Sequence, residues 1–138
     1  MPHNWLQTKY QNPRHYRRGL TIGTIGDMNL TKKKCIPCED KNLKPFTKVQ
    51  ANEYMNFLTD WVLAKNSKRI TRVILFKDFL KAMAFVTKVA GVAEGEGHHP
   101  DILISYNKVT LDFYTHSIGG LSENDFIVAA KINRLIKK

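Results

Sequence analysis

The chain has 138 residues, 43% of them hydrophobic, and this length and composition predict a single domain with a substantial core. No apolar run approaches the roughly 18 residues that a membrane-spanning helix needs, and no signal-peptide core is evident, so we expect a cytoplasmic protein without membrane contact. The net charge of +10 is scattered along the chain without interleaved aromatic residues, so solubility or an acidic substrate explains it better than a nucleic-acid partner.

Residues 1–27 differ from the remainder of the chain. They are basic, poor in acids and without a helical or strand period. Such a composition is typical of a targeting segment or an upstream extension. We expect this segment to be loosely ordered and without a catalytic residue, and the folded domain to span residues 28–138.

Two cysteines, Cys35 and Cys38, form the motif CIPC. One such pair supplies only half of a structural zinc site, and the strand and helix that flank a thioredoxin-like redox motif are not evident around it. We therefore interpret the motif as a reduced surface pair. A redox or metal role is the less favoured alternative.

A helix is predicted over residues 45–61. Thr47 and Gln50 have the spacing of a capping box, in which each side chain satisfies an unpaired backbone donor of the first turn. The apolar stripe of this helix contains Tyr54, Phe57 and Leu58. Residues 61–65 and 69–76 then read as two strands joined by a short turn. The apolar face of the second strand comprises Ile70, Ile74 and Phe76, with Arg72 interrupting it.

The strongest helix signal covers residues 77–93. Two apolar stripes run along it, and together they are wider than the roughly 100° that packing on one sheet requires. The first stripe comprises Phe76, Phe79, Leu80 and Met83, and the second comprises Phe85, Val86, Val89, Val92 and Ala93. We expect one side to pack against another subunit of a homodimer or homotetramer. A deeply buried helix in a monomer is the alternative.

A β-hairpin is predicted from residues 102–106 and 109–115, joined through Asn107 and Lys108. Strict alternation places Val109, Leu111 and Phe113 on one face, and Lys108, Thr110, Asp112, Tyr114 and His116 on the other. Ser122 and Asp125 then have the spacing of a second capping box, and a helix over 126–138 follows.

The predicted order is therefore α-β-β-α-β-β-α. Short hairpin connections imply an antiparallel sheet, and the three helices would cover one of its faces. We predict an α+β fold, with a four-stranded antiparallel sheet and three helices on one face.

The stretch EGEGHHPDILISYNKV carries the residues that suggest chemistry. His98 and His99 stand where the long helix is expected to end, and Pro100 disfavours helical geometry in the residue before it. Because a hairpin brings the start of one strand to the end of the next, we expect His116 beside this doublet. Glu94 is expected near the end of the helix.

Three imidazoles could bind zinc, but His98 and His99 point to opposite sides of an extended chain and are poor joint ligands. Proton transfer is the better interpretation, since histidine has an unperturbed pKa of about 6.5 and one imidazole can accept a proton while another donates. Elimination of water needs such an acid–base pair, and we expect no metal or cofactor. The plainer alternatives are a polar loop for the doublet, a strand-end hydrogen bond for His116, a solvated side chain for Glu94 and a helix cap for Asp125. For Asp125 the residues alone favour the cap.

The segment EGEGHHPDILISYNKVTLDFYTHSIGGLSENDF resembles the signature of the pterin-4a-carbinolamine dehydratases. The signature positions are matched by Glu94, His98, His99, Pro100, Tyr106, His116 and Asp125. The likeness covers residues 28–138, and KKCIPCE is similar to the start of many bacterial members.

This resemblance implies a lyase that dehydrates 4a-hydroxytetrahydropterin to quinonoid dihydropterin in tetrahydrobiopterin recycling, without a metal or cofactor. The substrate is a by-product of aromatic amino-acid hydroxylases, so such a hydroxylase is a candidate pathway partner. The family fold is a four-stranded antiparallel sheet with three helices on one side. Members form dimers and tetramers through the central helix.

The resemblance also implies roles for individual residues. His98, His99 and His116 would be catalytic, with His98 and His116 as the acid–base pair and His99 holding the pterin. Further substrate contacts would come from Glu94, Gly97, Pro100, Tyr114, Thr115, Ser117 and Asp125. Gly97 stands where many members have a polar residue, and Tyr114 stands where a smaller one is common, so the preferred pterin is open.

Two other functions are compatible with the resemblance. Some animal members bind the dimerisation helix of a transcription factor as coactivators, so a non-catalytic binding module is one alternative. A role in molybdopterin-related metabolism is another. The retained histidines favour an enzyme.

Overall fold

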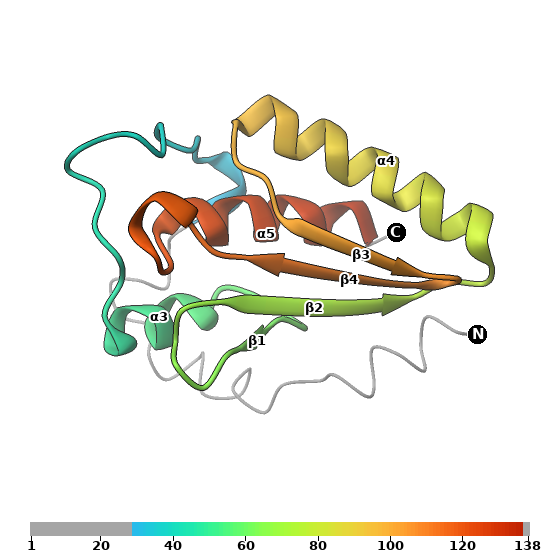
Figure 1. Cartoon of the computed structure of the whole chain (residues 1–138), viewed down its shortest axis with the longest axis horizontal. Coiled ribbons are helices and arrows are strands. Elements are labelled where there is room, and N and C mark those ends of the chain that lie inside the picture. Colours follow the sequence, from blue (N-terminus) through green and yellow to red (C-terminus); the bar gives the residue numbers. More distant parts are fainter. Residues whose placement is uncertain (1–28, 137–138) are drawn as a thin grey trace.

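The computed structural model describes residues 29–136, so the predicted extension at 1–27 lies outside the described residues. Within this part, the helices are α3 (Lys48–Met55), α4 (Phe79–Glu96) and α5 (Glu123–Ile136), and the strands are β1 (Val62–Leu63), β2 (Ile70–Leu75), β3 (Asp101–Ser105) and β4 (Lys108–Phe113) (Figure 1). Two short 3-10 helices, η2 (Leu30–Lys32) and η3 (His116–Ile118), complete the described elements. The predicted α+β class and element order are confirmed.

The strands form one antiparallel sheet in the order β1-β2-β4-β3. The predicted hairpin is present, because Ser105 pairs with Lys108 beside the turn and Asp101 pairs with Asp112 at the far end. Tyr106 in the turn has a φ of 54°, as the tight turns of two-residue hairpins require. The hairpin thus returns the chain to the end of α4 from which it set out.

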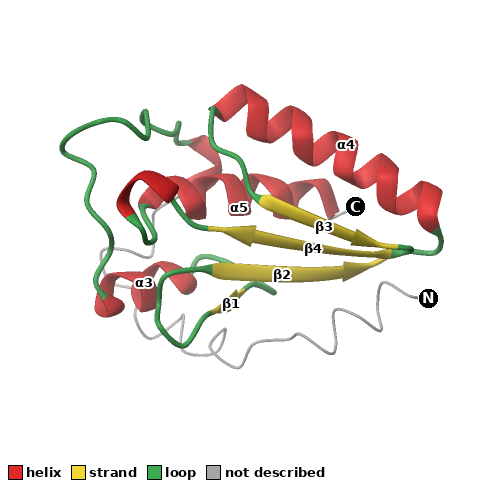
Figure 2. Ribbon diagram, in the orientation of Figure 1, coloured by secondary structure: helices red, strands yellow, loops and turns green. Residues whose placement is uncertain are grey.

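The core lies between one face of the sheet and the helices (Figure 2). The predicted apolar face of β4 is buried, as are the matching positions of β2. Trp61, Phe113 and Phe126 are the largest fully buried side chains. No helix among residues 29–136 combines the length and hydropathy that crossing a bilayer requires.

Several predicted elements differ in length from the observed ones. The helix expected over 45–61 ends at Met55, although its capping box of Thr47 and Gln50 is confirmed. The strand expected over 61–65 shortens to β1, because Asp60 before it and Ser67 after it adopt positive φ angles in turns.

Later elements differ as well. Helix α4 runs three residues further than the predicted end at residue 93, to Glu96, and α5 begins at Glu123 rather than 126. Strand β4 ends at Phe113, so the alternation predicted as far as His116 is wrong beyond that point. Thr115 instead forms an isolated bridge with Gly120, and the chain turns into η3.

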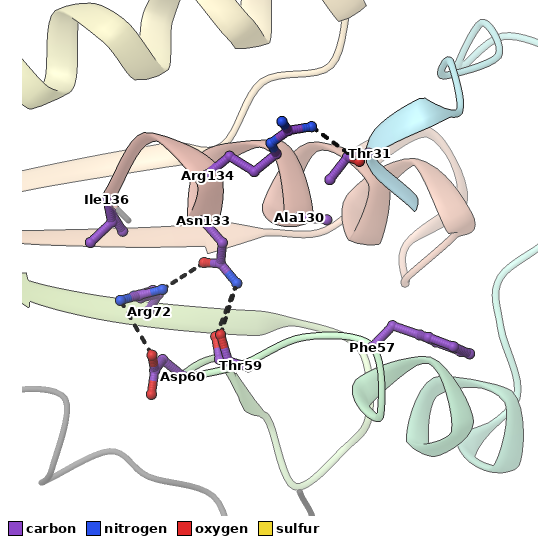
Figure 3. Close-up of a pocket in the computed structure, with 9 residues that line it drawn as sticks. All are labelled: Thr31, Phe57, Thr59, Asp60, Arg72, Ala130, Asn133, Arg134 and Ile136. Carbon is purple, nitrogen blue, oxygen red and sulfur yellow. Dashed lines mark hydrogen bonds and ion pairs between the residues drawn. The ribbon is translucent and has the colours of Figure 1, made fainter. Parts of the chain in front are cut away.

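Arg72, expected to interrupt the apolar face of β2, is buried on that face. Its Nη1 donates to Asn133 Oδ1 at 2.5 Å, and its Nη2 lies 3.6 Å from Asp60 Oδ2. Asn133 Oδ1 also accepts from Trp61 Nε1 at 2.8 Å, and Asn133 Nδ2 donates to the Thr59 carbonyl at 3.1 Å. We call these five residues the arginine cluster, and Figure 3 shows all of them except Trp61.

The arginine cluster borders a cavity of about 260 Å³ near the C-terminal end of α5. Burial lowers the pKa of Arg72, although the nearby Asp60 carboxylate opposes this effect. Among the described residues, the Nε of Arg72 has no hydrogen-bond partner. The cluster therefore holds a buried charge that is only partly compensated.

Candidate active site

His98 and His99 lie in the turn between the end of α4 and the start of β3. Gly97 caps the helix with a φ of 68°, a left-handed conformation that glycine adopts without a Cβ penalty. The backbone N–H of His98 donates to the Ala93 carbonyl at 3.1 Å, a carbonyl of the last turn that also accepts from the Gly97 N–H. The chain then leaves through the half-buried Pro100 into β3.

His98 is buried, with only 4% of its surface exposed. Its Nε2 lies 2.6 Å from Asp125 Oδ1 on α5. Its ring stacks almost parallel to that of Phe113, with centroids 5.7 Å apart and planes 8° apart. The ring is therefore held in one orientation by a carboxylate at its edge and an aromatic ring at its face.

Asp125 is fully buried and receives two further hydrogen bonds. Its Oδ2 accepts from Thr115 Oγ1 at 2.8 Å and from the Ser122 N–H at 2.9 Å. The second of these bonds is the helix cap that the sequence favoured, so that interpretation was right but incomplete. The same carboxylate therefore caps α5 and orients His98.

Cys38 lies against the other ring nitrogen of His98. The distance from Cys38 Sγ to His98 Nδ1 is 3.3 Å, and Ser117 Oγ donates to the Cys38 carbonyl at 2.7 Å. Both Cys38 and Cys35 carry free thiols. The interpretation as a surface pair is wrong, however, because both residues are partly buried and Cys38 belongs to the site.

The segment that carries Cys38 is anchored to the helices on either side of the site. The Cys35 N–H donates to Glu96 Oε1 at 3.1 Å, and Ile36 exchanges two backbone-to-side-chain hydrogen bonds with Asn124. Glu96 also pairs with Lys131. Sequence reasoning missed these anchors, since only the CIPC motif and the acidic end of α4 hinted at them.

Burial and these contacts change the acidity of the groups around the site. Burial, reinforced by the Glu96 carboxylate, raises the pKa of Cys35 to about 12. Burial also raises the pKa of Cys38, against a hydrogen bond with Asn124. Although burial opposes it, hydrogen bonds from Lys131 and from the Cys35 backbone lower the pKa of Glu96. At neutral pH both thiols are therefore protonated, and Glu96 is ionised.

His99 points away from His98, as expected for adjacent residues in an extended chain. Its side chain is 59% exposed, and its Nε2 lies 2.9 Å from Glu94 Oε1, which is itself on the surface. The doublet therefore separates into one buried and one accessible imidazole.

His116 directly follows Thr115, whose hydroxyl shares the Asp125 carboxylate with His98. It is exposed, and its ring centroid is 4.1 Å from that of the half-buried Tyr114. The Arg69 guanidinium lies 4.6 Å from the same tyrosine ring. Hydrogen bonds thus join His98 and Thr115 directly to Asp125, whereas His116 is linked to this group as the residue after Thr115.

Metal ligation is not supported by the arrangement of side chains. Within residues 29–136, no group of three or more His, Cys, Asp or Glu is placed to hold a metal ion. The geometry provides one buried imidazole that is oriented by a carboxylate, an accessible imidazole next to it in the chain at His99, and a third, also accessible, after β4 at His116. Such a set can accept and donate protons at neutral pH.

The family model for pterin 4 alpha carbinolamine dehydratase matches residues 44–135, which include this whole set of histidines and Asp125. The chain belongs to the pterin carbinolamine dehydratase family. The resemblance noted from the His-His-Pro signature is thereby confirmed, and the anchoring segment around Cys38 lies before the matched residues.

Individual relatives agree with this family. Pterin-4-alpha-carbinolamine dehydratase 2, mitochondrial, of Arabidopsis thaliana is 44% identical over 110 residues, covering 78% of this chain but 59% of the plant protein. A Nitrosomonas eutropha protein that carries the same dehydratase name is 45% identical over 109 residues, covering 78% of this chain and 94% of the relative.

A solved structure also matches the fold. The Brucella melitensis protein described as a transcriptional coactivator/pterin dehydratase has a TM-score of 0.64 and 34% sequence identity. The match covers 68% of this chain and all of the Brucella chain.

Proposed function

We propose that this member of the pterin carbinolamine dehydratase family removes water from 4a-hydroxytetrahydropterin and forms quinonoid dihydropterin by histidine acid–base catalysis. The observation that carries the proposal is the buried His98, which precedes β3 and lies 2.6 Å from Asp125 on α5. The substrate class, a pterin, and the reaction, dehydration, are inferred from the names of the relatives. Pterin recycling after an aromatic amino-acid hydroxylase is the context we propose.

In the proposed reaction, an acid protonates the leaving hydroxyl as its bond to carbon breaks, and a base removes a proton from the neighbouring atom. The products are water and a new double bond, so neither an oxidant nor a metal is required. His98 and His116 form the acid–base pair, and His99, supported by Glu94, holds the pterin. Asp125 acts through His98 as a positioning residue.

The remaining substrate contacts are proposed along the two chain segments that flank these histidines. One runs from Gly97 to Pro100 and the other from Tyr114 to Ser117. Tyr114 is half-buried between Arg69 and His116, so its ring is placed to limit the size of the pterin substituent.

Stopped-flow measurement of carbinolamine dehydration tests this proposal. We expect the wild-type chain to accelerate the reaction well above buffer, and His98→Ala and His116→Ala to lose a factor of about 100 or more. His15→Ala, in the segment outside the proposed domain, is the matched control and should keep the wild-type rate. The absence of any acceleration by the wild-type chain would refute the enzyme function.

Self-association is proposed for the exposed side of α4 and the neighbouring edge strand β3. Helix α4 buries Phe85, Val89 and Ala93 in the core, whereas Leu80 on its other stripe is 76% exposed. Leu103 on β3 is 64% exposed. These apolar side chains and the unpaired edge of β3 suit a second copy of the chain, in a dimer or tetramer.

Sedimentation equilibrium measures this association directly. We expect Leu80→Glu or Leu103→Glu to shift the assembly toward monomers while the fold persists. A wild-type chain that sediments as a monomer at micromolar concentration would refute the assembly.

A coactivator-like binding function is the alternative, suggested by the description of the Brucella relative as both a coactivator and a pterin dehydratase, while the names of the other relatives favour dehydration. The same exposed α4 stripe would then bind a partner helix. A pull-down with a helical dimerisation domain, compared between wild type and Leu80→Glu, distinguishes this function from dehydration, since dehydratase activity does not require the partner.

The domain boundaries and the location in the cell are also proposals. We propose a cytoplasmic protein with a catalytic domain at 28–138 and a dispensable extension at 1–27. Cell fractionation of the full chain and of a chain that starts at Met28 tests both. Accumulation of only the full chain in an organelle, as the name of the plant relative would suggest, would instead make the extension a targeting segment.

A further inference from the structure

The two ring nitrogens of His98 have different partners, Asp125 Oδ1 at Nε2 and Cys38 Sγ at Nδ1. An ionised carboxylate only accepts hydrogen bonds, so Asp125 Oδ1 requires a proton on His98 Nε2. In a neutral imidazole the other nitrogen then carries a lone pair. That nitrogen, Nδ1, faces Cys38 Sγ at 3.3 Å.

Cys38 is suited to donate to that lone pair. Burial raises the pKa of its thiol, so the thiol carries its proton at neutral pH. A thiol is a weak donor and an even poorer partner for an N–H, because sulfur accepts hydrogen bonds weakly. The contact therefore favours the neutral ring of His98 over the imidazolium.

The position of Cys38 is imposed by several residues outside the ring itself. Ser117 Oγ donates to the Cys38 carbonyl, and the preceding Cys35–Ile36 pair is bound to Glu96 and Asn124. The thiol thus reaches His98 from a segment that is tied to α4, to α5 and to η3. Phe113, an uncharged ring, covers the face of the imidazole.

We propose that Cys38 is a positioning residue whose S–H donates to Nδ1 of His98, opposes the pull of Asp125 toward the imidazolium and keeps His98 in the neutral form that serves as the general base. This inference rests on the proposed dehydratase function and assigns the acid to the accessible His116. The charged and titratable groups that act on the His98 environment are Asp125 on α5, Cys38 itself and Glu39 beside it.

The same contacts determine which nitrogen of His98 can accept a proton from substrate. Since Asp125 holds Nε2, a proton from substrate reaches His98 through Nδ1. The thiol must yield this position during the reaction, and two contacts hold Cys38 there, the hydrogen bond from Ser117 to its carbonyl and a side-chain hydrogen bond with Asn124. A weak donor such as S–H gives up this contact more easily than a charged group would.

Three variants test the role of the thiol. Cys38→Ala removes the donor, Cys38→Ser restores a donor at the same position, and Cys35→Ser changes the neighbouring thiol, which donates to the Asn124 carbonyl at 3.7 Å rather than to His98. The first readout is titration of His98 by nitrogen-15 NMR. We expect Cys38→Ala to move the midpoint to higher pH by about one unit, a tenfold gain in proton affinity, while the other two variants stay near wild type.

The second readout is the pH profile of dehydration. The acidic limb of kcat/KM should move to higher pH in Cys38→Ala and return in Cys38→Ser, with KM changed less than kcat at pH 7. A Cys38→Ala protein whose His98 titrates as in wild type would overturn the proposal. If neither the wild-type protein nor any variant shows dehydratase activity, the proposed function is refuted. The NMR titration of His98 then still tests the role of Cys38.

Discussion

Helix α5 carries a buried polar cluster at each end, and the two clusters are built differently. At its start, Asp125 accepts three hydrogen bonds and orients the buried His98. Near its end, Asn133 joins Arg72, Trp61 and Thr59 around a charge that is partly unsatisfied.

The difference indicates which cluster carries chemistry. An imidazole, the type of side chain that exchanges protons near neutral pH, lies at the start of α5, whereas a guanidinium that stays protonated is the only cation of the arginine cluster. We therefore expect substitutions at the first cluster to change activity more than stability, and substitutions at the second to do the reverse.

The largest expected effect is on activity, from Asp125→Asn. The amide keeps the size of the carboxylate and one acceptor, but it removes the charge that orients His98. We expect kcat/KM for dehydration to fall about 100-fold. The midpoint of thermal unfolding should stay close to that of the wild type. The exposed Asp101→Asn is the matched control, and a variant at Asp125 that kept a third of the wild-type rate would contradict the comparison.

The next effect is on stability, from Asn133→Ala. Loss of the amide leaves the Arg72 guanidinium and the Trp61 N–H without their acceptor in a buried position. We expect the free energy of unfolding in denaturant to fall by about 3 kcal/mol, with kcat unchanged for the folded fraction. Asn52→Ala on the surface of α3 should cost less than about 0.5 kcal/mol. A loss of activity in folded Asn133→Ala would show that the two ends of α5 are coupled.

The smallest expected effect is a loss of stability at alkaline pH, caused by the Cys35 thiol in the CIPC segment. The pKa of Cys35 is raised from 9.0 to about 12, so above pH 9 the unfolded chain loses this proton while the folded chain retains it. Stability is therefore complete below pH 9 and declines as the pH rises toward 12. Burial raises the pKa of Tyr54 to about 12 as well, so it contributes to the same decline.

Denaturant unfolding at several alkaline pH values measures this contribution. Cys35→Ala should flatten the decline in part, since Tyr54 remains. Parallel pH curves for wild type and Cys35→Ala would mean that the thiol makes no contribution.

Much of the fold could be predicted because it depends on contacts between residues close in the chain. The capping box of Thr47 and Gln50, the hairpin and the alternation that buries Val109 are of this kind, although the turn lies at Tyr106 and Asn107 and not at Asn107 and Lys108 as predicted. Boundaries were less accurate where turns compete with regular structure, as at Asp60 before β1 and after Phe113 at the end of β4.

The sequence by itself determined the element order, the His-His-Pro signature and the divergence of His98 from His99, since each follows from local backbone geometry. Only the tertiary structure decided that His98 is the buried member, that Asp125 both caps a helix and holds an imidazole, and that Cys38 completes the site. These contacts join residues 27 and 60 positions apart in the chain. They depend on how α5 and the CIPC segment pack against the sheet, and no local period or spacing records that packing.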